Sequence, residues 1–189
     1  MKINFFRWIF LIALLNTCLL LAERETRVEF RTGAFFPSSK FFKDIYGRSA
    51  VDFQFQAATE YCNFYELWTN FDWFSKHGHS IGFRDPTRVS IVNFSFGMNF
   101  LYPLNRCDKL YAGIGPSIGT VSVKNKFRRG SQRVSKTVVG GVVKAGLYLS
   151  LTDHLYADLF VDYLYQRVHF HKNVNIGGLK TGLGIGLVY

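Results

Sequence analysis

The strongest constraint on the fold of this chain is the way in which its side chains alternate. Eight segments carry apolar residues at every second position with polar or small residues between them: 27–36, 51–58, 65–74, 91–102, 110–121, 138–151, 155–166 and 179–189. A period of two is typical of β-strands whose faces meet different environments. Within these segments every charged side chain falls on the polar face. We therefore expect an all-β protein in which one face of each strand avoids charge.

The environment of the apolar face is either lipid or a protein core. After Leu21 no apolar run approaches about 18 residues, so only strands are able to cross a membrane. A soluble barrel such as a lipocalin would alternate in the same way but bury its apolar face. Aromatic residues near strand ends favour lipid, because they suit the interfacial girdles of membrane barrels; they are Phe36, Trp73, Tyr102, Tyr163, Tyr165 and Tyr189.

Two further features favour the membrane. Glycine is frequent on the polar face, which suits a narrow interior better than a water-exposed surface. The connections after the second, fourth and sixth segments are short or modest, whereas three of the other four are longer. We therefore predict an eight-stranded antiparallel transmembrane up-and-down β-barrel.

The first 22 residues predict a secretory signal peptide. Lys2 and Arg7 flank an apolar run over 8–21, and charged residues begin at Glu23. The run is short for an uncleaved anchor helix, and Thr17 does not fit a lipoprotein signal at Cys18. The predicted domains are thus a signal peptide, 1–22, and a barrel, 23–189. Loss of Lys2 and Arg7 lowers the formal charge from +10 to +8.

Charged residues on the polar face predict an ion network inside the barrel. An unpaired buried charge is costly, so these groups should pair; they are Glu29, Arg31, Asp52, Glu66, Asp72, Lys144, Asp158, Asp162 and Lys180. Asp158 and Asp162 resemble a catalytic carboxylate pair, but a structural role beside Lys144 and Lys180 is the preferred interpretation. Large inward side chains opposite glycine argue against a continuous pore; they are Trp68, Phe74, Tyr148 and Phe160.

The predicted outer loops are strongly basic. Segments 37–49, 75–88, 124–136 and 167–175 hold fourteen Lys and Arg against two acids. The densest cluster is Lys124, Lys126, Arg128, Arg129, Arg133 and Lys136. Phosphates of lipopolysaccharide or sulfated host glycans are suitable partners, and a merely solvated loop is the alternative. Nucleic acid fits poorly with display outside the cell.

Histidines and cysteines suggest only weak sites. The pairs His77 with His79 and His169 with His171 fall in different loops without nearby Cys or carboxylate ligands, so we predict no metal and no cofactor. Cys62 and Cys107 lie in successive short connections, where a disulfide, free thiols or intermolecular crosslinks are all open.

Three segments carry a resemblance to a known group. Residues 33–37, 110–116 and 178–189 resemble the small eight-stranded outer-membrane barrels, which include OmpA-like, OmpW-like and opacity-type proteins. The resemblance implies the outer membrane of a Gram-negative-type bacterium. It also implies that the last segment is read by the outer-membrane insertion machinery, through Gly182, Leu183, Ile185, Leu187 and Tyr189.

The resemblance leaves three functions open. The first is a non-enzymatic barrel in envelope structure or surface contact, as an adhesin or as a protein bound to lipid and lipopolysaccharide. The second is a narrow conduit for small hydrophobic molecules. The third is lipid A modification at the rim, for which His79 with Ser80 is the pair that invites comparison, although the surrounding motif is missing. The first is the prediction taken forward.

Overall fold

A computed structural model of the chain describes residues 25–61, 64–79, 86–105, 107–127, 130–169 and 173–189. The predicted signal peptide, 1–22, lies outside these residues. The elements are β1 (Thr26–Pro37), α2 (Lys40–Tyr46), β2 (Ala50–Tyr61), β3 (Tyr65–His79), β4 (Pro86–Pro103), β5 (Lys109–Phe127), β6 (Gly130–Ser150), β7 (Leu155–His169), β8 (Asn173–Asn175) and β9 (Gly178–Val188).

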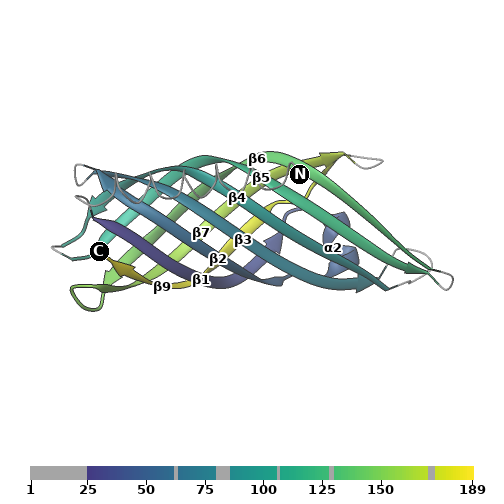
Figure 1. Cartoon of the computed structure of the whole chain (residues 1–189), viewed down its shortest axis with the longest axis horizontal. Helices are drawn as coiled ribbons and strands as arrows, with labels where there is room; N and C mark the ends of the chain where they lie inside the picture. The colour runs from purple at the N-terminus through teal and green to yellow at the C-terminus, as the bar shows by residue number, and fades with distance from the viewer. Residues whose placement is uncertain (1–24, 62–63, 80–85, 106, 128–129, 170–172) are drawn as a thin grey trace, which may run out of the picture.

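The strands close into a barrel (Figure 1). Each strand from β1 to β7 pairs antiparallel with the next, and β9 pairs with both β7 and β1, from Arg27↔Val188 to Pro37↔Gly178. The short β8 pairs with the end of β7. Each predicted segment overlaps one of the eight barrel strands, so the predicted fold is confirmed.

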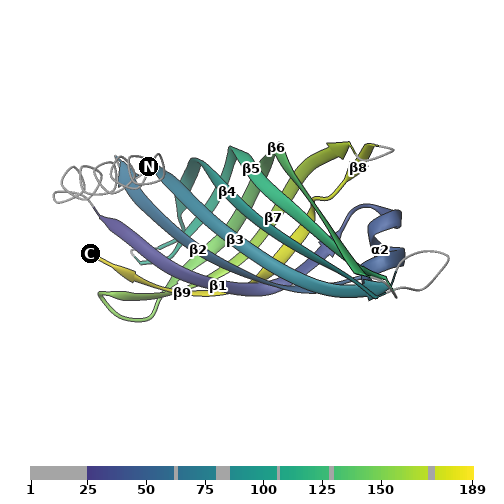
Figure 2. The ribbon, with the colours of Figure 1, turned by 45° about the vertical axis from the view of Figure 1, so that its right-hand side comes forward.

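The two ends of the barrel differ (Figures 1 and 2). The C-terminus and the connections β2–β3, β4–β5 and β6–β7 lie at one end, which we call the turn end. Helix α2 and β8 lie at the other end, which we call the mouth. The connections at the turn end are short, as predicted, but at the mouth β5 ends at Phe127 and β6 begins at Gly130, so the predicted long connection there is wrong.

All four predicted outer loops contain regular structure: within 75–88 β3 continues to His79 and β4 begins at Pro86, and within 167–175 β7 continues to His169 and β8 occupies Asn173–Asn175. Segment 124–136 was expected to be a loop, but β5 and β6 continue through it and pair as far as Phe127↔Gly130. The loop prediction is wrong because apolar and polar residues continue to alternate beyond Val121. The apolar residues now lie on the inward face and the polar residues on the outward face. Val121 and Val123 now point inward, and Ser122 and Lys124 point outward.

Segment 37–49, also expected to be a loop, contains α2. Phe42 and Tyr46 are one helical turn apart, and both are buried. The helix ends at Gly47, whose φ of 90° lies in the region that favours glycine, and the Gly47 N–H donates to the Lys43 carbonyl over 2.9 Å. Through its buried face, α2 packs over the mouth and covers it.

The barrel therefore has two kinds of interior. From the turn end to the level of Trp73 the inward side chains are mostly polar. In the last part of the barrel before the mouth they are mostly apolar. We call this last part the extension and define it as residues 74–79, 86–91, 121–127 and 130–138.

Candidate functional site

The outer surface between the two ends is apolar. Its exposed side chains include Phe30, Phe53, Phe55, Phe71, Phe94, Phe96, Ile114, Val143, Leu159 and Leu183. Exposed aromatic residues mark both edges: Phe36, Trp73, Tyr163 and Tyr165 toward the mouth, and Phe64, Tyr102 and Tyr189 toward the turn end. Such a band flanked by aromatic girdles is the surface that a transmembrane barrel presents to lipid. Among the described residues, no helix is long and apolar enough to span a membrane.

The centre of the lumen is organised around Arg31. Its guanidinium lies 2.5 Å from Glu29 and 2.7 Å from Asp158, and Nη1 is 3.8 Å from Asp162. All four side chains are buried. The Tyr111 hydroxyl donates to Asp158 over 3.1 Å, and Arg31 stacks 5.1 Å above the Phe160 ring. Asp158 and Asp162 thus neutralise a structural cation rather than face an open cavity.

Lys144 belongs to the same group. Its ammonium is 3.9 Å from Asp162 and 4.4 Å from the centre of the Trp68 ring, and it donates to Gln56. A buried cation is stabilised both by the carboxylate and by the face of the indole. Large side chains and ion pairs therefore fill this level of the lumen together.

A second group lies nearer the mouth. Lys180 on β9 is 2.7 Å from Asp72 on β3 and 3.3 Å from Asp52 on β2. Gln54 donates to Asp52, and Asn93 donates to Asp72, each over 2.9 Å. One lysine thus forms ion pairs with carboxylates from two other strands.

A third group lies at the turn end, where Arg27 is 2.9 Å from Glu66 and 2.5 Å from Glu60, and Lys109 is 2.7 Å from Glu60. Glu60 and Lys109 were missed from the sequence because the predicted segment 51–58 ends before Glu60 and the predicted segment 110–121 begins after Lys109. Glu60 continues the even-numbered face of Asp52, and Lys109 the odd-numbered face of Tyr111.

Nine residues were predicted to form the interior network, and the structure distributes them over these three groups. Glu29, Arg31, Lys144, Asp158 and Asp162 lie in the first group; Asp52, Asp72 and Lys180 in the second; and Glu66 in the third. Among the described residues, no group of His, Cys, Asp and Glu is suited to hold a metal ion.

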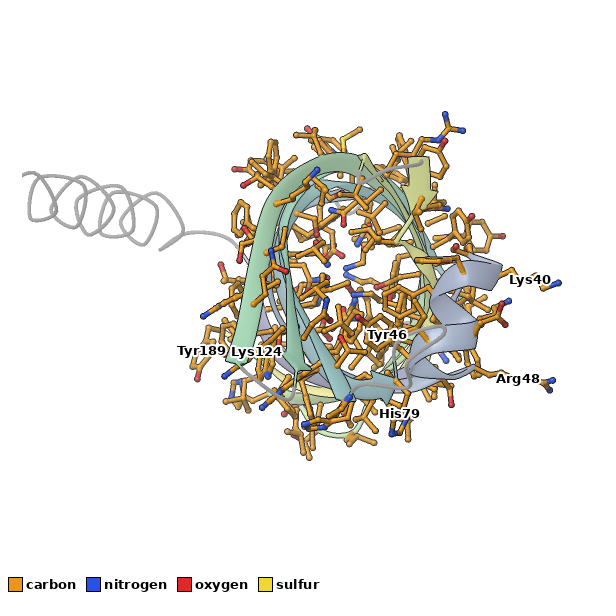
Figure 3. All side chains as sticks on the ribbon, turned by 90° about the vertical axis from the view of Figure 1, so that its right-hand side faces the viewer. Lys40, Tyr46, Arg48, His79, Lys124 and Tyr189 are labelled. Carbon is orange, nitrogen blue, oxygen red and sulfur yellow. The ribbon has the colours of Figure 1, made fainter. Side chains whose placement is uncertain are left out.

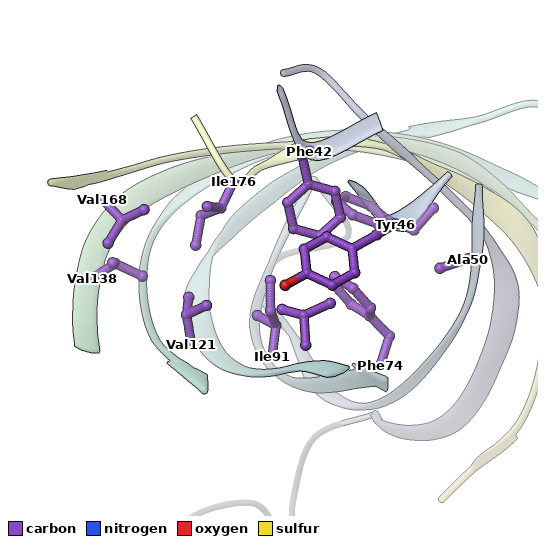
Figure 4. Close-up of a cluster of buried hydrophobic side chains, with 11 residues drawn as sticks. Phe42, Tyr46, Ala50, Phe74, Ile91, Val121, Val138, Val168 and Ile176 are labelled. Carbon is purple, nitrogen blue, oxygen red and sulfur yellow. The ribbon is translucent and has the colours of Figure 1, made fainter. Parts of the chain in front are cut away.

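The mouth is closed by an apolar cluster (Figure 4). It joins the inward residues of the extension to α2, and we call it the mouth cluster: Phe35, Phe42, Tyr46, Ala50, Phe74, Val89, Ile91, Val121, Val138, Val168 and Ile176. Phe35 and Phe74 are in contact, with ring centres 4.6 Å apart. Their contact and the packing of α2 leave the mouth filled by side chains.

Tyr46 connects α2 to the barrel wall. Figure 3 shows it within the ring of strands, while Lys40 and Arg48 point away from the barrel. Its hydroxyl is 3.3 Å from that of Thr87 on β4, which in turn donates to Asn125 on β5 over 2.6 Å. Burial raises the pKa of the Tyr46 phenol because the ionised form would lose its hydration.

The predicted basic cluster divides between two faces of the extension. Lys124 and Arg133 are paired neighbours on the outward face and are exposed, whereas Lys136 lies on the inward parity and is half-buried. Lys126 pairs through its backbone with Ser131. Arg128 and Arg129 lie outside the described residues. Among the described members, Lys124 and Arg133 thus share one face and Lys136 lies on the other.

The remaining predicted sites are placed in part. His77 and His79 are exposed on β3; β7 ends at His169; Ser80 and His171 fall outside the described residues. Cys107 is exposed, but Cys62 is not among the described residues, so their pairing stays a prediction. In the last strand, Leu183, Ile185 and Leu187 face outward, as does Tyr189 just after it.

Comparisons with known proteins identify the fold. No protein-family model matches the sequence, and no curated protein matches it either. Among solved structures, the outer membrane protein OprG from Pseudomonas aeruginosa has a TM-score of 0.67 at 10% identity, over 88% of this chain and 96% of OprG. Neisserial surface protein A has a TM-score of 0.62 at 12% identity, over 87% of this chain and 96% of that protein.

A third neighbour is Ail, the attachment invasion locus protein of Yersinia pestis. Its complex with the heparin analogue sucrose octasulfate has a TM-score of 0.60 at 16% identity, over 88% of this chain and 99% of Ail. At such identities the likeness concerns the fold. The chain thus has the fold of the small eight-stranded outer-membrane β-barrels, which confirms the resemblance predicted from its sequence.

Proposed function

We propose that this protein is a non-conducting, non-enzymatic barrel of the outer membrane, which contributes to envelope structure and contacts polyanions through the basic outward surface of its extension. In this proposal residues 1–22 are removed during export, and the insertion machinery reads the outward side chains of β9 and Tyr189. The polyanions are lipopolysaccharide or sulfated glycans of a host surface.

The observation that carries the proposal is a filled lumen inside an apolar wall. Three ion groups and the mouth cluster occupy the interior from the turn end to α2. A protein with this interior is expected to work through its outer surface rather than through transport. Exposed Lys124 and Arg133 supply positive charge there, and the Ail complex gives an example of the same fold in contact with a sulfated ligand.

The absence of enzymatic function is inferred from how the candidate groups are used. Asp158 and Asp162 both face Arg31, so neither is available as a general acid or base. Lipid A modification by His79 and Ser80 would appear as a change in lipid A mass when the protein is expressed, and replacement of either residue would abolish it. We expect no such change.

A second candidate is a conduit for small hydrophobic molecules, and one observation favours it. The interior of the extension is apolar, as a hydrophobic solute would require. The ion groups beneath it oppose passage through the whole lumen, so such a molecule would have to leave sideways. Uptake of a hydrophobic dye by vesicles that hold the protein would favour this candidate over the first.

The first test combines location, closure and binding. Outer and inner membranes are separated, and the unboiled protein is compared with the boiled protein by gel mobility. We expect a heat-modifiable band in the outer membrane, no conductance in planar bilayers, and binding to immobilised heparin that Lys124→Gln with Arg133→Gln weakens. A soluble periplasmic protein, or steady conductance through the lumen, would contradict the proposal.

A further inference from the structure

Two rows of outward side chains cross the four strands of the extension at its boundary with the apolar band. In the first row, Ser75 pairs with Ser90, Ser90 with Ser122, and Ser122 with Ser135. Two residues further along each strand toward the mouth, the second row is His77, Arg88, Lys124 and Arg133, which are paired in the same register. We call them the serine row and the basic row.

The rows form two matching units. On β3 and β4, Arg88 Nε donates to Ser75 Oγ over 2.8 Å, and the hydroxyls of Ser75 and Ser90 are 3.1 Å apart. On β5 and β6, Arg133 Nε donates to Ser122 Oγ over 2.8 Å, and Ser135 donates to Ser122 over 3.1 Å. Each arginine is thus held by its Nε, and its two terminal nitrogens make no hydrogen bond to another described residue. The units are two strand spacings apart, about 10 Å.

Within the sheet, the basic row has no acidic neighbour among the described residues. No outward position of β3 to β6 holds Asp or Glu, and neither Arg88 nor Arg133 forms an ion pair in the described part of the chain. Like charges directly opposite each other on neighbouring strands destabilise a sheet. Arg88, Lys124 and Arg133 stand in this arrangement, so a bound anion would relieve their repulsion.

The rows lie at the level of lipid headgroups. Trp73 pairs with Val92 in the row just below the serines, and outward Phe71, Phe94 and Ile118 lie beneath them. Four residues of strand separate Trp73 from His77, which corresponds to about 10 Å along the membrane normal for a tilted strand. Aromatic girdles mark the interface, so the basic row stands just outside the hydrocarbon.

We propose that the serine and basic rows bind the phosphate groups of a membrane lipid whose acyl chains lie on the apolar surface beneath them, and that a glycolipid with two phosphates, as in lipid A, occupies both units. Guanidinium groups bind phosphate through paired N–H donors, and serine hydroxyls add further donors. A soluble polyanion would match the charge but would leave the adjoining apolar surface unused. This inference rests on the proposed placement in the outer membrane and names the ligand of the proposed basic surface.

The test measures lipid retention in phosphate-free detergent. The protein is folded in dodecyl maltoside micelles, diphosphoryl lipid A is added, and native mass spectrometry counts the lipid that stays bound. We expect Arg88→Gln with Arg133→Gln to lower the apparent affinity about tenfold or more, because two charged hydrogen-bonding groups are lost. Each single variant should lose less, and dephosphorylated lipid A should bind the wild type as weakly as the double variant does.

A matched control changes the same charge elsewhere at the mouth. Lys40→Gln with Arg48→Gln removes one exposed cation of α2 and one that follows the helix, on the side of the mouth away from Lys124 (Figure 3). This control should retain lipid A like the wild type. Heat-modifiable gel mobility establishes that each variant is folded. If the double variant does not fold, the single variants are compared with the wild type instead.

Three results would overturn the inference: equal retention by the wild type and Arg88→Gln with Arg133→Gln, equal loss in the α2 control, or indifference to the lipid phosphates. Binding to heparin that persists while lipid A is not retained would also overturn it, but would leave the proposed function standing. Absence of the protein from the outer membrane would contradict both the proposed function and this inference.

Discussion

The extension continues strands that also form the part of the barrel within the apolar band. The two regions place their apolar residues on opposite faces of these strands. Within the band, β4 directs Asn93 inward and Phe94 outward. In the extension, the same strand directs Val89 inward and Arg88 outward. The backbone pairing continues through both regions without a change of register. The difference shows that the surroundings of a strand, rather than its geometry, decide which face is apolar: lipid outside demands one pattern and water outside demands the other.

The two interiors are also held together by different forces. The band has ion pairs and charged hydrogen bonds, which are stabilising as complete sets and costly when broken. The extension has the mouth cluster, in which each side chain contributes in proportion to the apolar surface that it buries. Substitutions of matched kind in the two regions should therefore have unequal effects.

The largest effect is expected for Arg31→Met in the central group. The change leaves Glu29, Asp158 and Asp162 with Lys144 as their remaining nearby cation, and an uncompensated buried charge costs about 3–5 kcal/mol. Equilibrium unfolding in detergent by denaturant, followed by tryptophan fluorescence, measures the loss. Arg31→Lys keeps the charge and should fall between the variant and the wild type. A loss below about 1 kcal/mol for Arg31→Met would show that the network is solvated.

Next in size is the comparison of Phe94→Arg with Ser90→Arg, which are two outward positions of β4. Phe94 lies in the apolar band, where arginine costs about 2–4 kcal/mol near the middle of the bilayer. Ser90 lies in the extension, where the change removes its contact with Ser75 and adds charge beside the basic row, and should cost about 0.5–1.5 kcal/mol. Unfolding in phospholipid vesicles measures both. Similar costs at the two positions would mean that the boundary between band and extension is placed wrongly.

The smallest effect is expected for Tyr46→Phe, which removes the hydrogen bond between α2 and Thr87 and should cost about 0.5–1.5 kcal/mol at neutral pH. Because folding raises the pKa of Tyr46, its contribution is complete below the ordinary phenol pKa of about 10 and is lost as pH rises through the folded-state pKa. Wild type and variant should thus converge in denaturant midpoint at high pH. As a control, replacement of exposed Tyr102 by Phe at the turn end should change neither the denaturant midpoint at neutral pH nor its dependence on pH.

The barrel itself was predictable because alternation is a local signal that every strand repeats. Arg31, Lys144 and Asp162 lie on the polar parity of three different strands, so their inward placement followed from counting. Which of them would be neighbours did not follow, since that depends on the stagger between strands. The register sets this stagger, as in Lys144↔Asp162 and Asp162↔Lys180.

The extension and α2 were harder to predict. Ile91, Val121 and Val138 are apolar residues on the parity expected to be polar, and this exchange was the available sign that the strands leave the membrane without ending. The basic residues between 124 and 136 were interpreted as a loop because charge is usual in loops, whereas Lys124 and Arg133 lie on the outward face of a sheet. The burial of Phe42 depends on contacts with Phe35 and with Phe74, and Phe74 is distant in the sequence.

The pairing of β9 with β1 has a consequence for assembly. Strands made first and last must meet before either has its full set of hydrogen bonds, so contacts between distant residues dominate closure and make it slow. Until β9 arrives, Asp52 and Asp72 lack the cation that Lys180 supplies, and the sheet has open edges that lipid does not tolerate. Hydrogen bonding and ion pairing are therefore completed in one event. A partly closed barrel is thus an unstable intermediate, which favours an all-or-none folding transition.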